Sequence, residues 1–253
     1  MLKPSIVLQK IVERVFRAAG FSFQKLPPVG YVPINVLDLV VQEVYRENGQ
    51  FSFIEIGAND GKHVDPMYRY VRNSGWKGLL VEPHPSIFKK LRENYRGIPG
   101  MVLENSAITE RDGSVKLFAF ESDDLHAGML ASLNKGYVKF NGDGVKGKVK
   151  EFEVPSLSVS SLLLKHGIEE FDLLQIDTEG HDYNILIQFL DRGILPRIIH
   201  FENNFFTWSE KNEVARRLTN LGYNYLHLGI DTLAYRQSNH EGFEKRMGAT
   251  KLT

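Results

Sequence analysis

Residues 51–61 read FSFIEIGANDG, and this stretch decides the fold. Its first residues have the apolar and aromatic side chains of a buried strand, which runs into the carboxylate of Glu55. Gly57 and Gly61 follow, with three residues between them. Glycine lets a backbone pass close to a ligand and leave a loop tightly, whereas a plain turn needs one glycine and no acid. We therefore expect the strand to end at a small-molecule site.

The spacing of these residues indicates the kind of ligand. A dinucleotide site shows G-x-G-x-x-G leading into a helix that meets a pyrophosphate, but here the spacing is G-x-x-x-G, and Glu55 would repel a phosphate. A carboxylate suits a cation, such as the ammonium of a methionine moiety. Glu82 ends a second predicted strand twenty-one residues after Gly61, where an acid accepts hydrogen bonds from both ribose hydroxyls. Together they indicate S-adenosylmethionine; the alternative is a glycine turn beside two unrelated acids.

The composition narrows the class of protein. The 253 residues include 31 basic and 31 acidic side chains, so no net charge draws the chain to nucleic acid or anionic lipid. There is no cysteine, which excludes disulfides, thiolate catalysis and cysteine-ligated metals. With no signal peptide and no apolar run long enough to span a membrane, we expect a cytoplasmic protein.

The chain divides into an N-terminal helical extension, residues 1–50, and a larger domain, residues 51–253. In the extension, the apolar spacing predicts helices over residues 5–19 and 34–48. We expect these helices to cap the core or to support a homodimer.

From residue 51 onward, predicted strands alternate with helices, which is typical of a parallel sheet that binds its ligand at the strands' C-terminal ends. Helices are predicted from Asp65, with Pro66 in the first position, and over 86–97, with Ser86 as the cap. Glycine-rich residues 121–150 break the alternation, and we expect them to form a loop that covers the site. The predicted strands are 51–56, 75–83, 101–105, 114–120, 171–177 and 197–202, with an antiparallel pair at 222–229 and 231–237.

Three separated motifs point to one protein family. FIEIGANDG (53–61), GWKGLLVEPHPSIFKKL (75–91) and LLQIDTEGHDYNIL (173–186) resemble the FkbM family of S-adenosylmethionine-dependent methyltransferases in order and spacing, over residues 51 to about 236. The resemblance implies the α/β, Rossmann-like class I methyltransferase fold: seven strands, mostly parallel, the last one antiparallel, with helices on both faces. It also implies methyl transfer to oxygen, commonly on sugar hydroxyls of glycans, glycolipids or natural products.

The same resemblance assigns cofactor-binding residues. Glu82, followed by Pro83, holds the ribose. The methionine end is lined by Glu55, Gly57, Asn59, Asp60 and Gly61, and the adenine is flanked by Asn105, Ser106 and Ala107. Two positions depart from the family pattern on the acceptor side: Gln175 stands where members often carry lysine, and Ser160-Ser161 replaces a frequent Leu-Asp pair.

The chemistry needs a base or a metal, because the pKa of an alcohol is far above neutrality. Candidates follow the strands predicted at 171–177 and 197–202. In one hypothesis, Asp177, Glu202 and Asn203 are oxygen ligands of Mg²⁺ or Mn²⁺. In a second, His181 or Asp177 takes the hydroxyl proton directly. In a third, Asp177 and Glu179 only cap the next helix.

The sequence thus predicts an S-adenosylmethionine-dependent O-methyltransferase acting on a hydroxyl of a sugar or glycan, with Asp177, His181 and Glu202 as catalytic candidates. The alternatives are O-methylation of a non-sugar natural product, a nicotinamide-dependent sugar-modifying enzyme on a similar sheet, or a cofactor-binding partner without turnover. The balanced charge disfavours a nucleic-acid methyltransferase.

Overall fold

The computed structural model describes residues 36–63, 65, 67–121, 130–141 and 147–236. The predicted helix at 5–19 and any dimer contact made by it lie outside these residues, as does Pro66. None of the helices in the described ranges combines the length and apolar character needed to cross a membrane.

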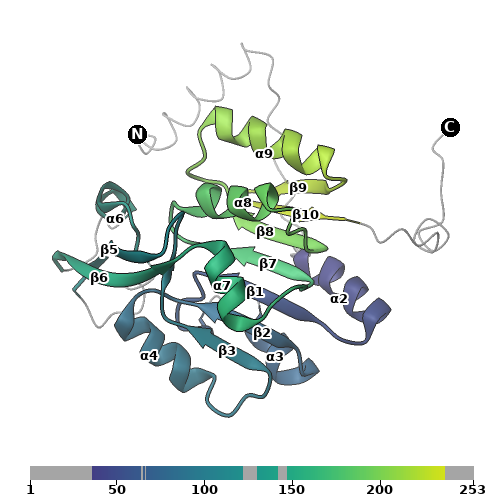
Figure 1. The fold of residues 1–253 in the computed structure, drawn as a ribbon, viewed down its shortest axis with the longest axis horizontal. Coiled ribbons are helices and arrows are strands. Elements are labelled where there is room, and N and C mark those ends of the chain that lie inside the picture. The colour runs from purple at the N-terminus through teal and green to yellow at the C-terminus, as the bar shows by residue number, and fades with distance from the viewer. Residues whose placement is uncertain (1–35, 64, 66, 122–129, 142–146, 237–253) are drawn as a thin grey trace, which may run out of the picture. The chain divides into compact units, whose positions relative to one another are not determined.

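The main sheet has seven strands, and Figure 1 shows them side by side. They are β1 (Ser52–Ile56), β2 (Lys77–Val81), β3 (Met101–Glu104), β7 (Leu173–Ile176), β8 (Ile198–Glu202), β9 (Asn224–Leu228) and β10 (Asp231–Tyr235). Their order is β3-β2-β1-β7-β8-β10-β9. The strands from β3 to β8 run parallel, and β10 lies antiparallel between β8 and β9. The predicted α/β fold and its antiparallel last strand are confirmed.

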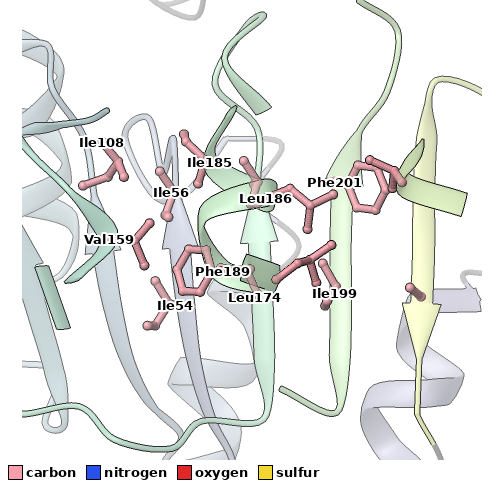
Figure 2. Packing of buried hydrophobic residues seen from close by; sticks show 14 of the residues in the cluster. Ile54, Ile56, Ile108, Val159, Leu174, Ile185, Leu186, Phe189, Ile199 and Phe201 are labelled. Carbon is pink, nitrogen blue, oxygen red and sulfur yellow. The ribbon is translucent and has the colours of Figure 1, made fainter. Parts of the chain in front are cut away.

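Helices cover both faces of this sheet. They are α2 (Val36–Asn48), α3 (Tyr68–Ser74) and α4 (Pro85–Asn94) in one apolar cluster, and α7 (Val159–His166), α8 (Asp182–Asp191) and α9 (Trp208–Asn220) in the other. Alternate side chains of a strand point to opposite faces, so Phe53 packs in the first cluster and Ile54 and Ile56 in the second. Figure 2 shows Ile54 with Leu174 and the ring of Phe189 in the second cluster. By the same alternation, Glu55 faces the side of α2, α3 and α4.

The helix predicted at 34–48 is confirmed as α2, but it belongs with the sheet rather than with a separate extension. Leu37, Val41 and Val44 are buried in the same cluster as Phe53, and Arg197 pairs with Glu47 at 2.7 Å. The compact unit accordingly begins at Val36, before the expected boundary at residue 50.

A second, three-stranded sheet follows β3. It contains β4 (Ala107–Ile108), β6 (Val149–Leu157) and β5 (Gly113–Phe120), with β6 between the other two. The expected single loop at 121–150 instead includes the helix α6 (Lys135–Asn141) and the start of β6, which Figure 1 shows beside β5. Val138 of α6 is buried with Phe120 and Leu130. Long-range pairing of β5 with β6 and this small core decide the segment's structure.

Two predicted helix starts differ from the structure. Helix α3 begins at Tyr68, and Asp65 lies in the turn before it, where its carboxylate accepts a 2.6 Å hydrogen bond from the amide of Met67. Helix α4 begins at Pro85, and its cap residue His84 makes no side-chain capping bond. Ser86 is therefore inside the helix, because proline is well suited to the first helical position.

Candidate active site

The C-terminal ends of β1, β2 and β7 border one cleft. Its empty space is about 950 Å³, a volume that includes space open to solvent. Leu117, Ala131 and Leu133 of the second sheet and the segment after it line the opposite wall. The predicted site residues that line the cleft are Glu55, Gly57, Asn59, Glu82, Pro83, Ser106, Ala107, Asp177 and His181.

Gly57 is required by the approach of two strand ends. Its φ is +91°, and a Cβ atom at this position would lie 1.7 Å from the carbonyl oxygen of Asp177. The amides of Gly57 and Ala58 both donate to the carbonyl of Val81 at 3.0 Å. The loop after β1 is thereby held against the ends of both neighbouring strands, and the floor of the cleft is backbone.

Glu82 is buried at the end of β2, and both its carboxylate oxygens accept backbone hydrogen bonds. Oε2 accepts from the amide of Asn59 at 3.0 Å, and Oε1 accepts from the amide of His84 at 2.7 Å. Burial raises the pKa of Glu82 to about 7, although these two bonds favour the charged form. Each oxygen keeps a further lone pair, so the carboxylate can still accept from two ligand hydroxyls.

Asp60, which the resemblance places on the cofactor, is not among the residues that line the cleft. Its carboxylate accepts from the amide of His63 at 2.9 Å and lies 2.6 Å from the Nδ1 atom of that ring. Burial alone would raise the pKa of Asp60, but the bonds from His63 and Lys62 outweigh it and lower the pKa. Asp60 therefore lies outside the cleft and fixes the loop after β1 through its hydrogen bonds with Lys62 and His63.

Gly61 and Asn105 also support the cleft from outside it. A Cβ atom on Gly61 would lie 2.4 Å from side-chain atoms of Leu91 and of Tyr95, so glycine permits α4 to pack closely. Asn105 donates from Nδ2 to the carbonyl oxygens of Glu82 at 2.8 Å and Pro83 at 3.2 Å, which fixes the chain after β2.

The loop between β7 and α8 brings several polar side chains to the cleft: Asp177, Thr178, Glu179 and His181. Asp182, the first residue of α8, braces this loop, since its carboxylate accepts from the amides of Thr178 at 3.1 Å and Gly180 at 3.2 Å. The N-cap residue of α8 is His181, and no side chain caps the helix, so neither Asp177 nor Glu179 has the capping role considered for them. Glu179 adopts a positive φ of 56° and its carboxylate accepts from the hydroxyl of Tyr137 on α6.

The two candidate bases have shifted pKa values. Removal of bulk water by the surrounding protein, together with repulsion from Asp182 and Asp231, raises the pKa of Asp177 to about 7; its side chain stays exposed to the cleft. Burial lowers the pKa of His181, which the carboxylate of Glu110, 3.7 Å from Nε2, partly opposes. Both groups are therefore able to accept a proton near neutral pH.

The expected metal ligands do not assemble. Asn203 donates from Nδ2 to Thr232 at 2.7 Å and lines a separate small pocket with Phe201 and Phe206. Glu202 lies beyond the residues that line the cleft. Within the described ranges there is no group of three or more His, Cys, Asp or Glu side chains placed to hold a metal ion, so the residues do not fit this role.

Glu202 is instead a buried acid that lies near other carboxylates. One of its oxygens, Oε2, is buried and finds no hydrogen-bond donor in the described part of the chain. Burial, followed by repulsion from Asp177 and Asp182, raises the pKa of Glu202 to about 8. At neutral pH this side chain therefore holds a proton more readily than a free glutamate does.

Five polar residues that were not among the predicted catalytic or binding residues also line the cleft: His63, Asp65, Gln175, Thr178 and Glu179. Gln175 is buried, and its Oε1 lies 2.7 Å from Nδ1 of His200 on β8. The Asp-Pro pair at residues 65–66 predicts only the start of a helix. A local pattern of this kind does not indicate which distant residues the side chain of Asp65 will contact. The family pattern had pointed to position 175 on the acceptor side, and the register Glu55↔Gln175 places it at the same edge of the cleft.

The comparison with curated proteins gave no match. Among solved structures, a methyltransferase FkbM from Methylobacillus flagellatus KT is 9% identical with a TM-score of 0.44, covering 74% of this chain. The chain spans 43% of that structure's length. A human methyltransferase 10 domain containing protein is 11% identical with a TM-score of 0.40, covering 91% of this chain and 96% of its own. Precorrin-6y C5,15-methyltransferase from Geobacter metallireducens GS-15 is 12% identical with a TM-score of 0.39, covering 86% and 95%.

A family model gives the decisive comparison. The model of the methyltransferase FkbM domain matches residues 55–225, which run from the end of β1 into β9 and include every residue of the cleft. This match spans more than half of the chain and agrees with the seven-stranded sheet described above. The chain belongs to the FkbM methyltransferase family.

Proposed function

We propose that the protein is an S-adenosylmethionine-dependent O-methyltransferase that methylates a hydroxyl of a sugar in a glycan, glycolipid or glycosylated metabolite. The observation that carries this proposal is the pair of buried carboxylates, Glu55 and Glu82, at the ends of adjacent strands and in the wall of one cleft. One acid suits an ammonium and the other a ribose, and the two are separated along the cleft by Gly57 and Asn59.

The remaining walls suit the rest of the cofactor. Ala107, Ile108 and Leu117 form an apolar surface near Glu82 and Ser106 that would take the adenine. When bound, the cofactor supplies an electrophilic methyl group on a sulfonium. The protein's own part is to hold both reactants in line and to remove the hydroxyl proton.

Asp177 is the group we assign to proton removal. It is exposed to the cleft from the end of β7, and its raised pKa of about 7 makes it a stronger base than an ordinary aspartate at neutral pH. His181, four residues later on the same loop, is the second candidate.

The cleft also favours an acceptor without negative charge. None of the described residues that line it is lysine or arginine, whereas Asp177 and Glu179 both face it. A phosphate or carboxylate on the acceptor would therefore meet repulsion, and a neutral sugar hydroxyl would not.

The test is transfer of a labelled methyl group from S-adenosylmethionine to a panel of neutral glycans, glycolipids and non-sugar alcohols, followed by mass spectrometry. We expect O-methylation of a sugar, and a much slower reaction with the Asp177→Asn variant. Methylation of non-sugar alcohols alone would overturn the acceptor class. NADH binding in a fluorescence titration, without binding of S-adenosylmethionine, would overturn the reaction.

A further inference from the structure

Glu55 has a neighbour of the same charge that the sequence did not suggest. The side chain of Glu55 is 4% exposed, and its Oε2 atom has no hydrogen-bond donor among the described residues. The carboxylate of Asp65 is close enough for its negative charge to raise the pKa of Glu55, and both side chains line the cleft. Two neighbouring carboxylates repel each other unless a proton or a cation lies between them.

The contacts of Asp65 hold it in this place. Its Oδ1 accepts from the amide of Met67 at 2.6 Å, and its Oδ2 accepts from the hydroxyl of Tyr95, the residue after α4, at 3.0 Å. The turn before α3 therefore presents a fixed carboxylate to the end of β1. This arrangement would be costly if its only result were repulsion from Glu55.

Among the described residues, none that faces this pair supplies the missing positive charge. Asp177, just after β7, adds a further negative charge near Glu55, and Gln175, the register partner of Glu55 on β7, is neutral. Tyr95, just after α4, offers an uncharged hydroxyl, and the ring of His63 is engaged by Asp60. Burial, with repulsion from Asp65, raises the pKa of Glu55 well above its usual value, and burial raises that of Asp65 to about 6.

We propose that Glu55 and Asp65 form a two-carboxylate clamp for the α-ammonium of the cofactor's amino-acid end, and that the proton shared by the free pair leaves when the ammonium enters. An ammonium has three N–H donors, so it can donate to one oxygen of each carboxylate. The incoming cation takes the place of the proton, which goes to solvent. This inference rests on the proposed function and adds Asp65 as a binding residue.

The test compares two ligands that differ at the amino-acid end. S-adenosylhomocysteine carries the ammonium, whereas 5′-methylthioadenosine lacks the whole amino-acid group. By calorimetry, Asp65→Asn should weaken S-adenosylhomocysteine by about 10- to 100-fold, as expected for a charged hydrogen bond. It should change the dissociation constant of methylthioadenosine by less than about threefold, since the contacts of the nucleoside are distant from this substitution.

The matched control is Asp191→Asn, the same chemical change at an exposed carboxylate on α8 that pairs with Arg217; it should leave both affinities unchanged. If Asp65→Asn does not fold by circular dichroism, Glu55→Gln serves for the same comparison. Equal weakening of both ligands would show a merely structural role and overturn the proposal. Unchanged affinity for S-adenosylhomocysteine would overturn it too.

Proton release is measured separately. Titrations of the wild-type protein at a pH of about 6, close to the raised pKa of Asp65, in buffers of different ionisation enthalpy should show that binding of S-adenosylhomocysteine, but not of methylthioadenosine, releases a proton. Binding of S-adenosylhomocysteine to the Asp65→Asn variant should release fewer protons than binding to the wild-type protein. Equal release with both ligands, or none, would overturn the shared proton. Failure of the wild-type protein to bind either ligand would instead overturn the proposed function itself.

Discussion

The carboxylate of Glu82, at the end of β2, accepts a 3.0 Å hydrogen bond from the backbone amide of Asn59, in the loop after β1. Asn59 has a positive φ of 50°, a conformation that asparagine tolerates better than most residues. The same carboxylate holds the amide of His84. One side chain therefore both shapes the loop and lines the cleft.

Replacing Glu82 should affect folding and binding together. In Glu82→Ala, two backbone amides lose their acceptor, so we expect a loss of about 1–3 kcal/mol in the free energy of unfolding. The dissociation constant of methylthioadenosine should rise about 10- to 100-fold, because its ribose hydroxyls lose the same carboxylate. Urea unfolding and calorimetry measure the two effects. Wild-type affinity in a folded Glu82→Ala variant would refute the ribose assignment.

Gly57→Ala should be far more damaging than alanine at another left-handed glycine. The new Cβ would lie 1.7 Å from the carbonyl oxygen of Asp177, whereas at Gly97, with a φ of +76°, it would meet nothing within 4 Å. We expect a loss of about 3 kcal/mol or more for Gly57→Ala and of about 1 kcal/mol for Gly97→Ala, which bears only the backbone cost. Equal losses in urea unfolding would contradict the close approach of the two strand ends.

Glu202→Gln should stabilise the protein increasingly as the pH rises. The pKa of Glu202 is raised to about 8 in the folded chain, against about 4.3 when unfolded. Between these values the folded state holds a proton that the unfolded state has lost, so wild-type stability falls as the pH rises. The glutamine variant has no carboxyl group to titrate at this position, so its stability does not fall with pH for this reason. We expect a gain of about 2 kcal/mol at a pH of about 8.5, after allowance for screening, and almost none at a pH of about 5.

The control for this measurement is Glu104→Gln. Glu104 is held by Lys165 at 2.8 Å and His166 at 2.9 Å, and these partners lower its pKa although burial alone would raise it. This group contributes stability above its unfolded pKa, so its loss should destabilise the protein from a pH of about 5 to about 8.5. Thermal melts of both variants across that range show whether the two signs differ; a gain for Glu202→Gln that does not grow with pH would contradict the assignment.

Asp177→Asn should reduce turnover without loss of the cofactor. Removal of a general base typically lowers kcat about 10²- to 10⁴-fold, while the affinity for S-adenosylhomocysteine should stay nearly unchanged. The wild-type kcat/KM should rise with pH through the Asp177 pKa of about 7, and this limb should vanish in the variant. His181→Asn is the matched comparison. If it removes the limb and Asp177→Asn does not, the base is His181.

Much of the fold could be predicted from local patterns in the sequence. Strands β1, β2, β7 and β8 were predicted because buried parallel strands are continuous apolar runs that end at glycine, proline or an acid. The hairpin of β9 and β10 and the helix α2 follow equally local patterns. Strand β6 and helix α6 were missed, because pairing of β5 with β6 and the contact of Val138 with Phe120 are long-range.

The sequence by itself determined that acids stand at the ends of β1 and β2 beside a glycine loop, since strand periodicity and turn chemistry act over a few residues. Only the tertiary structure decided which acids face the cleft. It turned Asp60 away, as well as the amide of Asn203, engaged Asp182 with the loop before α8, and placed Asp65 near Glu55. These outcomes depend on contacts between separate elements, whose geometry is fixed by packing on the sheet.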